Sequence, residues 1–184
     1  MASKSFCPLP WTHLATHPHG SVTLCCESEQ IQRASEARDD PKEFKTLHTE
    51  DYNFNRIHNN DNFNKIRVQM LDGKRPDVCT RCWDKEDAGI DSKRTIDSRK
   101  LNFTEEHARQ ITNEDGSIND VSYEFIELRL GNHCNLAGRT CNPISSSRWK
   151  KDWQKAGFDE RLILPQKLMD WPLDSLFWES VELY

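Results

Sequence analysis

The chain has 184 residues, of which 35% are hydrophobic and 30% are charged. This length suits one ordinary domain or two small ones with a modest core. Thirty acidic against 25 basic residues give a formal net charge of −5. The lysines and arginines form no cluster that would indicate contact with a nucleic-acid backbone, so we expect no nucleic-acid partner.

The N-terminal stretch MASKSFCPLPW has no apolar signal core, and no apolar run approaches the ~18 residues that a membrane-spanning helix needs. We therefore expect a cytoplasmic protein without a membrane partner. The chain contains seven cysteines. In a reducing compartment, cysteines in this number indicate metal or cluster ligation rather than disulfides.

Residues 7–26, CPLPWTHLATHPHGSVTLCC, predict a β-hairpin in which WTHLAT and SVTLCC flank the turn HPHG. The simplest register pairs Thr16 with Ser21. Alternation then places Cys26 on the apolar face as a small core residue and leaves Cys25 free to be a ligand. A bulge would exchange these roles, so Cys26 is the alternate ligand.

Helices are predicted in the middle of the chain. A short one is expected near residues 41–47. The stretch DNFNKIRVQMLDG then predicts a longer helix that begins after an N-cap at Asn60 or Asp61 and ends at Gly73. Further helical segments are expected after the C-x2-C pair, ending near Gly89, and at residues 105–111. The buried face of the longer helix should carry Phe63, Ile66 and Met70.

The C-terminal third predicts one strand followed by helices. SYEFIELRL, residues 122–130, alternates in a way that favours a strand with one well-buried face. Along SSSRWKKDWQKA, Trp149 and Trp153 lie four residues apart, which favours a helix with both aromatic side chains in the core. A last helical stretch is expected around residues 166–181.

Four cysteines form the first candidate metal site. Two come from the hairpin region and two from a C-x2-C pair, a spacing that lets two thiolates reach one centre. Four thiolates hold either a tetrahedral zinc ion or a [4Fe–4S] cluster, and the spacing alone leaves both open. The residues of this site are Cys7, Cys25, Cys79 and Cys82.

Two stretches resemble known cluster motifs. The spacing Cys7-x12-Gly20-x4-Cys25 resembles the opening half of the auxiliary-cluster modules of radical S-adenosylmethionine enzymes. ELRLGNHCNLAGRTCNP resembles the strand and the C-x3-C-x2-C loop that hold the catalytic cluster of the same enzymes. It retains Cys134 and Cys141, and Gly138 stands in the place of the middle cysteine.

In order and spacing, these motifs resemble the twitch-domain-containing radical S-adenosylmethionine proteins over about residues 6–150. The resemblance implies an α/β fold whose N-terminal part is α+β. A twitch-like module with the hairpin (11–26) and the C-x2-C pair (79–82) would occupy residues 1–95, followed by a linker at 96–121. Residues 122–184 would begin an incomplete (β/α) partial barrel, with room for about two strand–helix units.

The resemblance also implies a function. The family cleaves S-adenosylmethionine reductively to a 5′-deoxyadenosyl radical that acts on a substrate, here unknown, with a flavodoxin or ferredoxin as reductant. Cys7, Cys25, Cys79 and Cys82 would hold an auxiliary [4Fe–4S] cluster, and the loop of Cys134 and Cys141 would hold the radical S-adenosylmethionine cluster. Because Gly138 removes one of its three ligands and the barrel is short, we expect this chain to be inactive alone.

Two other functions stay open at this point. The chain could be a non-catalytic metal-binding module in which the four cysteines hold zinc or an iron–sulfur cluster. It could also be one half of a split enzyme, because a two-unit barrel leaves apolar faces and a sheet edge that a second polypeptide would cover.

Overall fold

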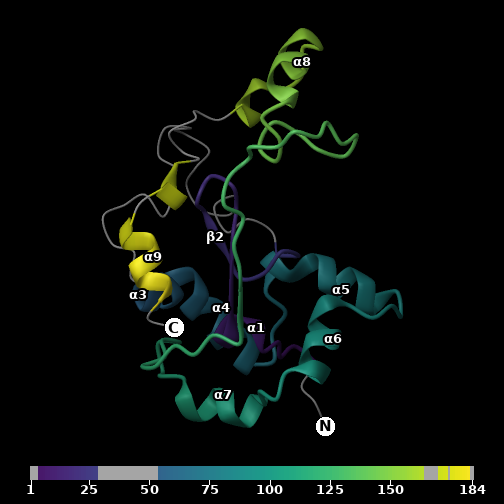
Figure 1. The fold of residues 1–184 in the computed structure, drawn as a ribbon. Coiled ribbons are helices and arrows are strands. Elements are labelled where there is room, and N and C mark those ends of the chain that lie inside the picture. The colour runs from purple at the N-terminus through teal and green to yellow at the C-terminus, as the bar shows by residue number, and fades with distance from the viewer. Residues whose placement is uncertain (1–3, 29–53, 164–169, 174, 183–184) are drawn as a thin grey trace.

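The computed structural model describes residues 4–28, 54–163, 170–173 and 175–182. Its described part is a mixed α/β fold with a small three-stranded sheet and several short helices (Figure 1), which confirms the predicted fold class. The elements are α1 Leu9–Thr12, β1 His13–Thr16, β2 Val22–Thr23, α3 Phe54–His58, α4 Asp61–Leu71, the 3-10 turn η1 Asp77–Cys79, α5 Thr80–Asp87, α6 Lys93–Lys100, α7 Glu105–Ile111, β3 Phe125–Glu127, α8 Trp149–Lys155, the 3-10 turns η2 Glu160–Leu162 and η4 Trp171–Leu173, and α9 Ser175–Val181.

The two best-predicted helices are α4 and α7. Helix α4 begins after Asn60, whose side-chain oxygen accepts hydrogen bonds from the backbone N–H groups of Asn62 and Phe63. Helix α7 begins after Thr104, which caps it in the same way through the N–H of His107. The apolar face expected for α4 is buried, with Phe63, Ile66 and Met70.

The hairpin forms, but the predicted register is wrong by one residue. The structure pairs Thr16 with Val22 instead of Ser21. Ser21 belongs to the loop, because its carbonyl accepts a hydrogen bond from the N–H of His17 at 2.8 Å. The turn also requires Gly20, which has a φ of +81°. A longer loop shifts every pair on β2, so the faces derived from the simplest register do not hold.

Strand β3 pairs with the free edge of β1 and runs parallel to it, so the strand order in the sheet is β2-β1-β3. It is shorter than the predicted strand, and neither face is well buried, since Phe125 is 37% exposed and Ile126 is half-buried. The prediction for the helix with Trp149 and Trp153 is correct only in part. Helix α8 forms, but Trp149 and Trp153 are only partly buried on it, and α8 projects away from the other elements (Figure 1).

The main core lies between the N-terminal segment and helices α4 and α7. Trp11 is fully buried in it, and its Nε1–H donates to Thr112 Oγ1 at 2.8 Å. Residues on both sides of the predicted boundary at 95 share this core, and the partly buried Tyr123 packs against it from beyond the boundary at 121. Both boundaries stay a prediction. The buried members are Phe6, Cys7, Leu9, Trp11, Leu24, Cys25, Phe63, Ile66, Met70, Ala108, Ile118 and Val121.

Two of the predicted helices lie wholly or partly outside the described residues, and one observed helix was not predicted. The short helix near 41–47 and part of the stretch 166–181 lie outside the described residues. Helix α6 was not predicted: it begins with a capping box between Ser92 and Thr95. No helix in the described ranges is long and apolar enough to cross a membrane.

Candidate metal centre

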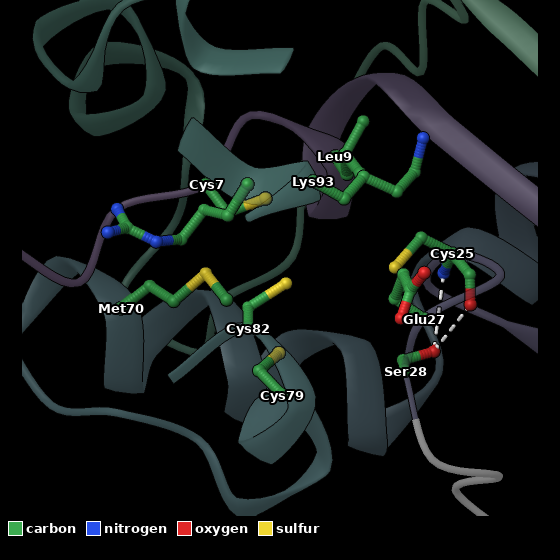
Figure 2. A pocket seen from close by; sticks show the side chains of 10 residues that line it. Cys7, Leu9, Cys25, Glu27, Ser28, Met70, Cys79, Cys82 and Lys93 are labelled. Atoms are coloured by element: carbon green, nitrogen blue, oxygen red, sulfur yellow. Dashed lines mark hydrogen bonds between the residues drawn. The ribbon is translucent and has the colours of Figure 1, made fainter. Parts of the chain in front are cut away.

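Four thiols predicted from sequence spacing line one pocket beside the main core (Figure 2). The empty space between its walls, including the part open to solvent, is about 320 Å³. In Figure 2, Cys25 faces Cys7, Cys79 and Cys82 from the opposite side of this space. The lining residues are Cys7, Leu9, Cys25, Glu27, Ser28, Met70, Cys79, Cys82, Lys93 and Arg94.

Cys7 and Cys25 are presented by turns rather than by strands. Cys7 is 7% exposed and lies two residues before α1, whose N-cap is Pro8. Cys25 lies just after β2, at the start of a turn closed by Ser28. The hydroxyl of Ser28 donates to the Cys25 carbonyl at 2.8 Å, and its backbone N–H donates to the same oxygen at 3.2 Å. These bonds hold the Cys25 thiol toward the pocket.

Cys79 and Cys82 are presented by the start of α5. Cys79 is the N-cap residue of that helix, and its N–H donates to the carbonyl of Pro76 at 3.0 Å. Trp83 follows Cys82, and its Nε1–H donates to the same Pro76 carbonyl at 3.0 Å, which fixes the turn before the helix. A helix N-terminus favours negative charge, so this end of α5 suits thiolate ligands.

Burial and mutual proximity raise the pKa of three of these thiols, those of Cys7, Cys25 and Cys79. Burial raises the pKa of Cys7 well above its ordinary value, against a hydrogen bond with the Leu9 backbone, and the three other thiols raise it further. Burial raises the pKa of Cys25 to about 11. Burial, Cys25 and Cys82 raise the pKa of Cys79, while the charge of Arg94 acts in the opposite direction. Ligation of a metal must therefore displace protons from them.

Cys26 lies apart from the pocket. The prediction that it is a small core residue is wrong, because the chain turns after Thr23 and leaves Cys26 exposed. Although Cys26 is exposed, partial desolvation of its sulfur and the neighbouring carboxylate of Glu127 raise the pKa of Cys26. It is not among the residues that line the pocket, so the structure gives Cys25, rather than Cys26, the position expected for the ligand.

The second cysteine loop has partly exposed thiols. The Sγ atom of Cys134 accepts a hydrogen bond from the Leu136 N–H at 3.3 Å. The carbonyl of Gly138 accepts hydrogen bonds from the Cys141 N–H and from Trp149 Nε1, both at 3.0 Å. A Cβ atom at Gly138 would lie 3.3 Å from the Cys141 sulfur. Position 138 is therefore next to one cysteine of the motif.

Neither set of cysteines forms a site for one ion. Among the described residues, no group of three or more histidine, cysteine or acidic side chains has the arrangement that holds a single metal ion. The four thiols of the first set instead surround a space.

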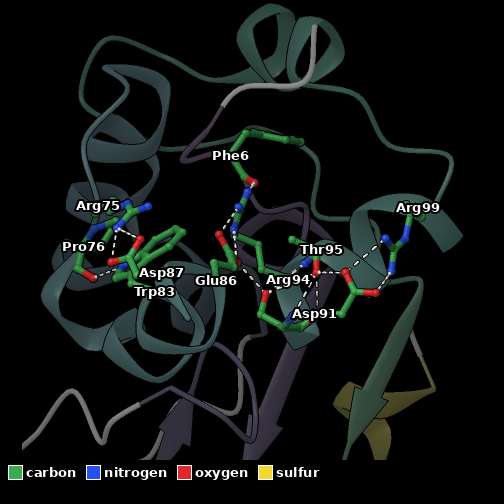
Figure 3. Close-up of polar contacts among 11 residues, drawn as sticks. Phe6, Arg75, Pro76, Trp83, Glu86, Asp87, Asp91, Arg94, Thr95 and Arg99 are labelled. Carbon is green, nitrogen blue, oxygen red and sulfur yellow. Dashed lines mark hydrogen bonds and ion pairs between the residues drawn. The ribbon is translucent and has the colours of Figure 1, made fainter. Parts of the chain in front are cut away.

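Sequence reasoning missed the charged residues next to this space. The guanidinium of Arg94 donates from Nε to Glu86 Oε1 at 2.9 Å and from Nη1 to the carbonyl of Phe6 at 2.8 Å (Figure 3). It also lies 5.0 Å from the centroid of the Trp83 ring. Arg94 thus links α6 to α5 and to the residue before Cys7. These contacts join residues far apart in sequence, and no local spacing pattern indicates them.

Comparison with known families supports the cluster interpretation. Residues 7–83 match the family model SPASM, described as an iron-sulfur cluster-binding domain. No curated protein and no solved structure gave a match. The match covers fewer than half of the residues, begins at Cys7 and includes Cys25, Cys79 and Cys82.

Residues 7–83 are therefore similar to an iron–sulfur cluster-binding domain, and domains of this kind are typical of radical S-adenosylmethionine proteins. This confirms the predicted family resemblance for residues 7–83. It leaves the catalytic chemistry of that family as a proposal for this chain.

Proposed function

We propose that this chain binds a [4Fe–4S] cluster through Cys7, Cys25, Cys79 and Cys82, as the auxiliary cluster of a protein of the radical S-adenosylmethionine type. One observation carries the proposal: four thiols from three separate segments line a single pocket, and all four lie within the matched cluster-binding domain. When bound, such a cluster accepts and releases single electrons.

The spread of the thiols favours a cluster over zinc. Zinc bonds to sulfur are about 2.3 Å long, so four ligands of one tetrahedral ion lie in mutual contact. A four-iron cluster carries its own sulfides and fills a space between its ligands. The position of Cys25 across the pocket from the other three cysteines supports the larger group.

The chain's own residues would hold the group and limit access of water to it. Leu9 and Met70 give the pocket apolar walls and are almost completely buried, at 1% and 0% exposure. Trp83 is 6% exposed and lies directly after Cys82. Restricted access of water and the surrounding charge are both determinants of a cluster's reduction potential.

The loop of Cys134 and Cys141 would be the counterpart of the loop that holds the catalytic cluster in the family. It supplies two thiols where the family uses three, because Gly138 has no side chain. We therefore infer that this chain holds one cluster, in the four-cysteine pocket, and does not cleave S-adenosylmethionine by itself.

The adjacent cysteines 25 and 26 give a matched test. After anaerobic reconstitution of the full chain with iron and sulfide, Cys25→Ser should lose most of the bound iron, as should Cys79→Ser or Cys82→Ser. Cys26→Ser should bind as much iron as the unaltered chain, because its thiol lies outside the pocket. Far-ultraviolet circular dichroism checks that each variant is folded. If Cys26→Ser loses the iron and Cys25→Ser keeps it, the ligand assignment is wrong.

A further inference from the structure

Two consecutive basic residues of α6, Lys93 and Arg94, line the four-cysteine pocket. Lys93 forms an ion pair with Asp97 at 2.9 Å, and Arg94 forms one with Glu86. Among the described residues, Lys93 and Arg94 line the pocket, and Asp97 and Glu86 do not. In both ion pairs, the residue that lines the pocket is therefore the basic one.

Of the two pairs, Arg94 with Glu86 is the more deeply buried. Its side chains are 10% and 13% exposed, against 24% and 14% for Lys93 and Asp97. Ser92 Oγ also donates to Glu86 Oε1 at 2.5 Å. With so little water around it, the charge of Arg94 is weakly screened, and its hydrogen bonds keep it in one place (Figure 3).

One acidic side chain also lines the pocket. Glu27 forms an ion pair with Lys85 at 3.6 Å, and their side chains are 31% and 44% exposed. Water screens this more exposed pair more strongly. Of the three charged residues that line the pocket, Arg94 is therefore the one whose charge water screens least.

We propose that the buried pair of Arg94 and Glu86 sets the reduction potential of the cluster, with Arg94 raising the potential and Glu86 lowering it. This inference rests on the proposed function, because it requires a cluster in the four-cysteine pocket. Reduction adds one electron to the cluster and breaks no bond, with the electron supplied by a one-electron donor such as dithionite. A nearby positive charge stabilises the more negative, reduced state, and a negative charge destabilises it.

The test is a redox titration of the reconstituted full chain, with the reduced cluster followed by electron paramagnetic resonance. Arg94→Gln should lower the midpoint potential, because it leaves the Glu86 carboxylate without its partner. Glu86→Gln should raise the potential, because it leaves the guanidinium uncompensated. We expect each change to alter the equilibrium constant of reduction about tenfold, which is about 59 mV for one electron.

The chain provides matched controls. Arg75 and Asp87 form a similar pair on Trp83, with Arg75 5.2 Å from the ring centroid, but their side chains are 43% and 60% exposed. Arg75→Gln and Asp87→Asn should shift the potential by less than about a third of the shifts at the buried pair, because water screens them. Arg94→Lys keeps the positive charge, so its potential should stay near that of the unaltered chain.

The opposite signs separate an electrostatic role from a purely structural one. A structural role would reduce cluster content in both variants without moving their potentials in opposite directions. Shifts of the same sign, or none, overturn the inference while the proposed function stands. If Arg94→Gln retains no cluster, Glu86→Gln decides: a higher potential supports the inference and an unchanged one overturns it. Failure of the unaltered chain to bind iron would contradict the proposed function, and the inference with it.

Discussion

Replacement of Arg67 is expected to weaken this fold strongly. Arg67 is 0% exposed on α4, and its guanidinium donates to three backbone carbonyls: Pro10 at 2.8 Å, His58 at 2.7 Å and Gly116 at 3.0 Å. Burial lowers the pKa of Arg67 to about 10, so the group is still charged at pH 7. The residue thus ties α4 to the segment just after Cys7.

Arg67→Met should destabilise the protein strongly, because methionine fills similar space and donates no hydrogen bond. An unsatisfied buried carbonyl costs about 1–3 kcal/mol, and removal of the buried charge offsets part of this. For three carbonyls we expect a loss of about 3–5 kcal/mol in the free energy of unfolding. At about 2–4 °C per kcal/mol for a chain of this size, the melting temperature should fall by roughly 10 °C.

Urea and thermal unfolding, followed by circular dichroism, measure this loss. Arg99→Met is the control, because Arg99 and its partner Asp91 have side chains that are 62% and 59% exposed, and it should leave the unfolding midpoint near that of the unaltered chain. A loss below about 1 kcal/mol for Arg67→Met would refute the assignment of the three carbonyls to this guanidinium.

Two further predictions concern histidine protonation and the second loop. Burial, and to a lesser degree the charge of Arg67, lowers the pKa of His58 to about 3. Between pH 6.5 and 3 the unfolded chain therefore binds a proton at His58 that the folded chain does not. The free energy of unfolding should decrease as the pH is lowered through this range, by up to about 1.4 kcal/mol per pH unit. The urea concentration at the unfolding midpoint, measured at pH 7, 6 and 5, should decrease less steeply for His58→Gln than for the unaltered chain as the pH is lowered. An equally steep decrease in both proteins would contradict the role of His58. Gly138→Cys should raise the iron content above that of the unaltered chain, and unchanged iron would count against a lost ligand beside Cys141.

Local signals in the sequence were sufficient for several elements. Asn60 and Thr104 are visible N-caps followed by helix-forming residues, and α4 and α7 begin where these caps predict. Helix α6 has a cap in Ser92 but little apolar periodicity, and polar residues fill most of its length. Its position is set by tertiary contacts of Arg94, which the sequence does not display.

The hairpin shows why register is harder to predict than the presence of a strand. Proline and glycine in HPHG located the turn correctly, but one extra residue, Ser21, joins the loop through its bond with His17. That single residue changes every cross-strand pair. The position of Cys25 is then decided by the turn with Ser28 rather than by strand alternation.

The candidate site, like the fold, could be predicted from the sequence only in part. The four cysteines could be selected from their spacing, because ligand spacing reflects the local turns that present thiols. The charges around them could not, since Glu86 and Arg94 meet only after α5 and α6 pack together. The predicted partners, a second polypeptide and a flavodoxin or ferredoxin, stay predictions.

The most direct test of the central claim is the metal content of the full chain after anaerobic reconstitution, with iron, sulfide and zinc counted per chain and the visible absorption spectrum recorded. The account predicts about four irons with matching sulfide, which is one cluster in the pocket of Cys7, Cys25, Cys79 and Cys82. About eight irons would contradict the inference that the loop at Gly138 holds no second cluster. One zinc ion and no iron would contradict the cluster itself.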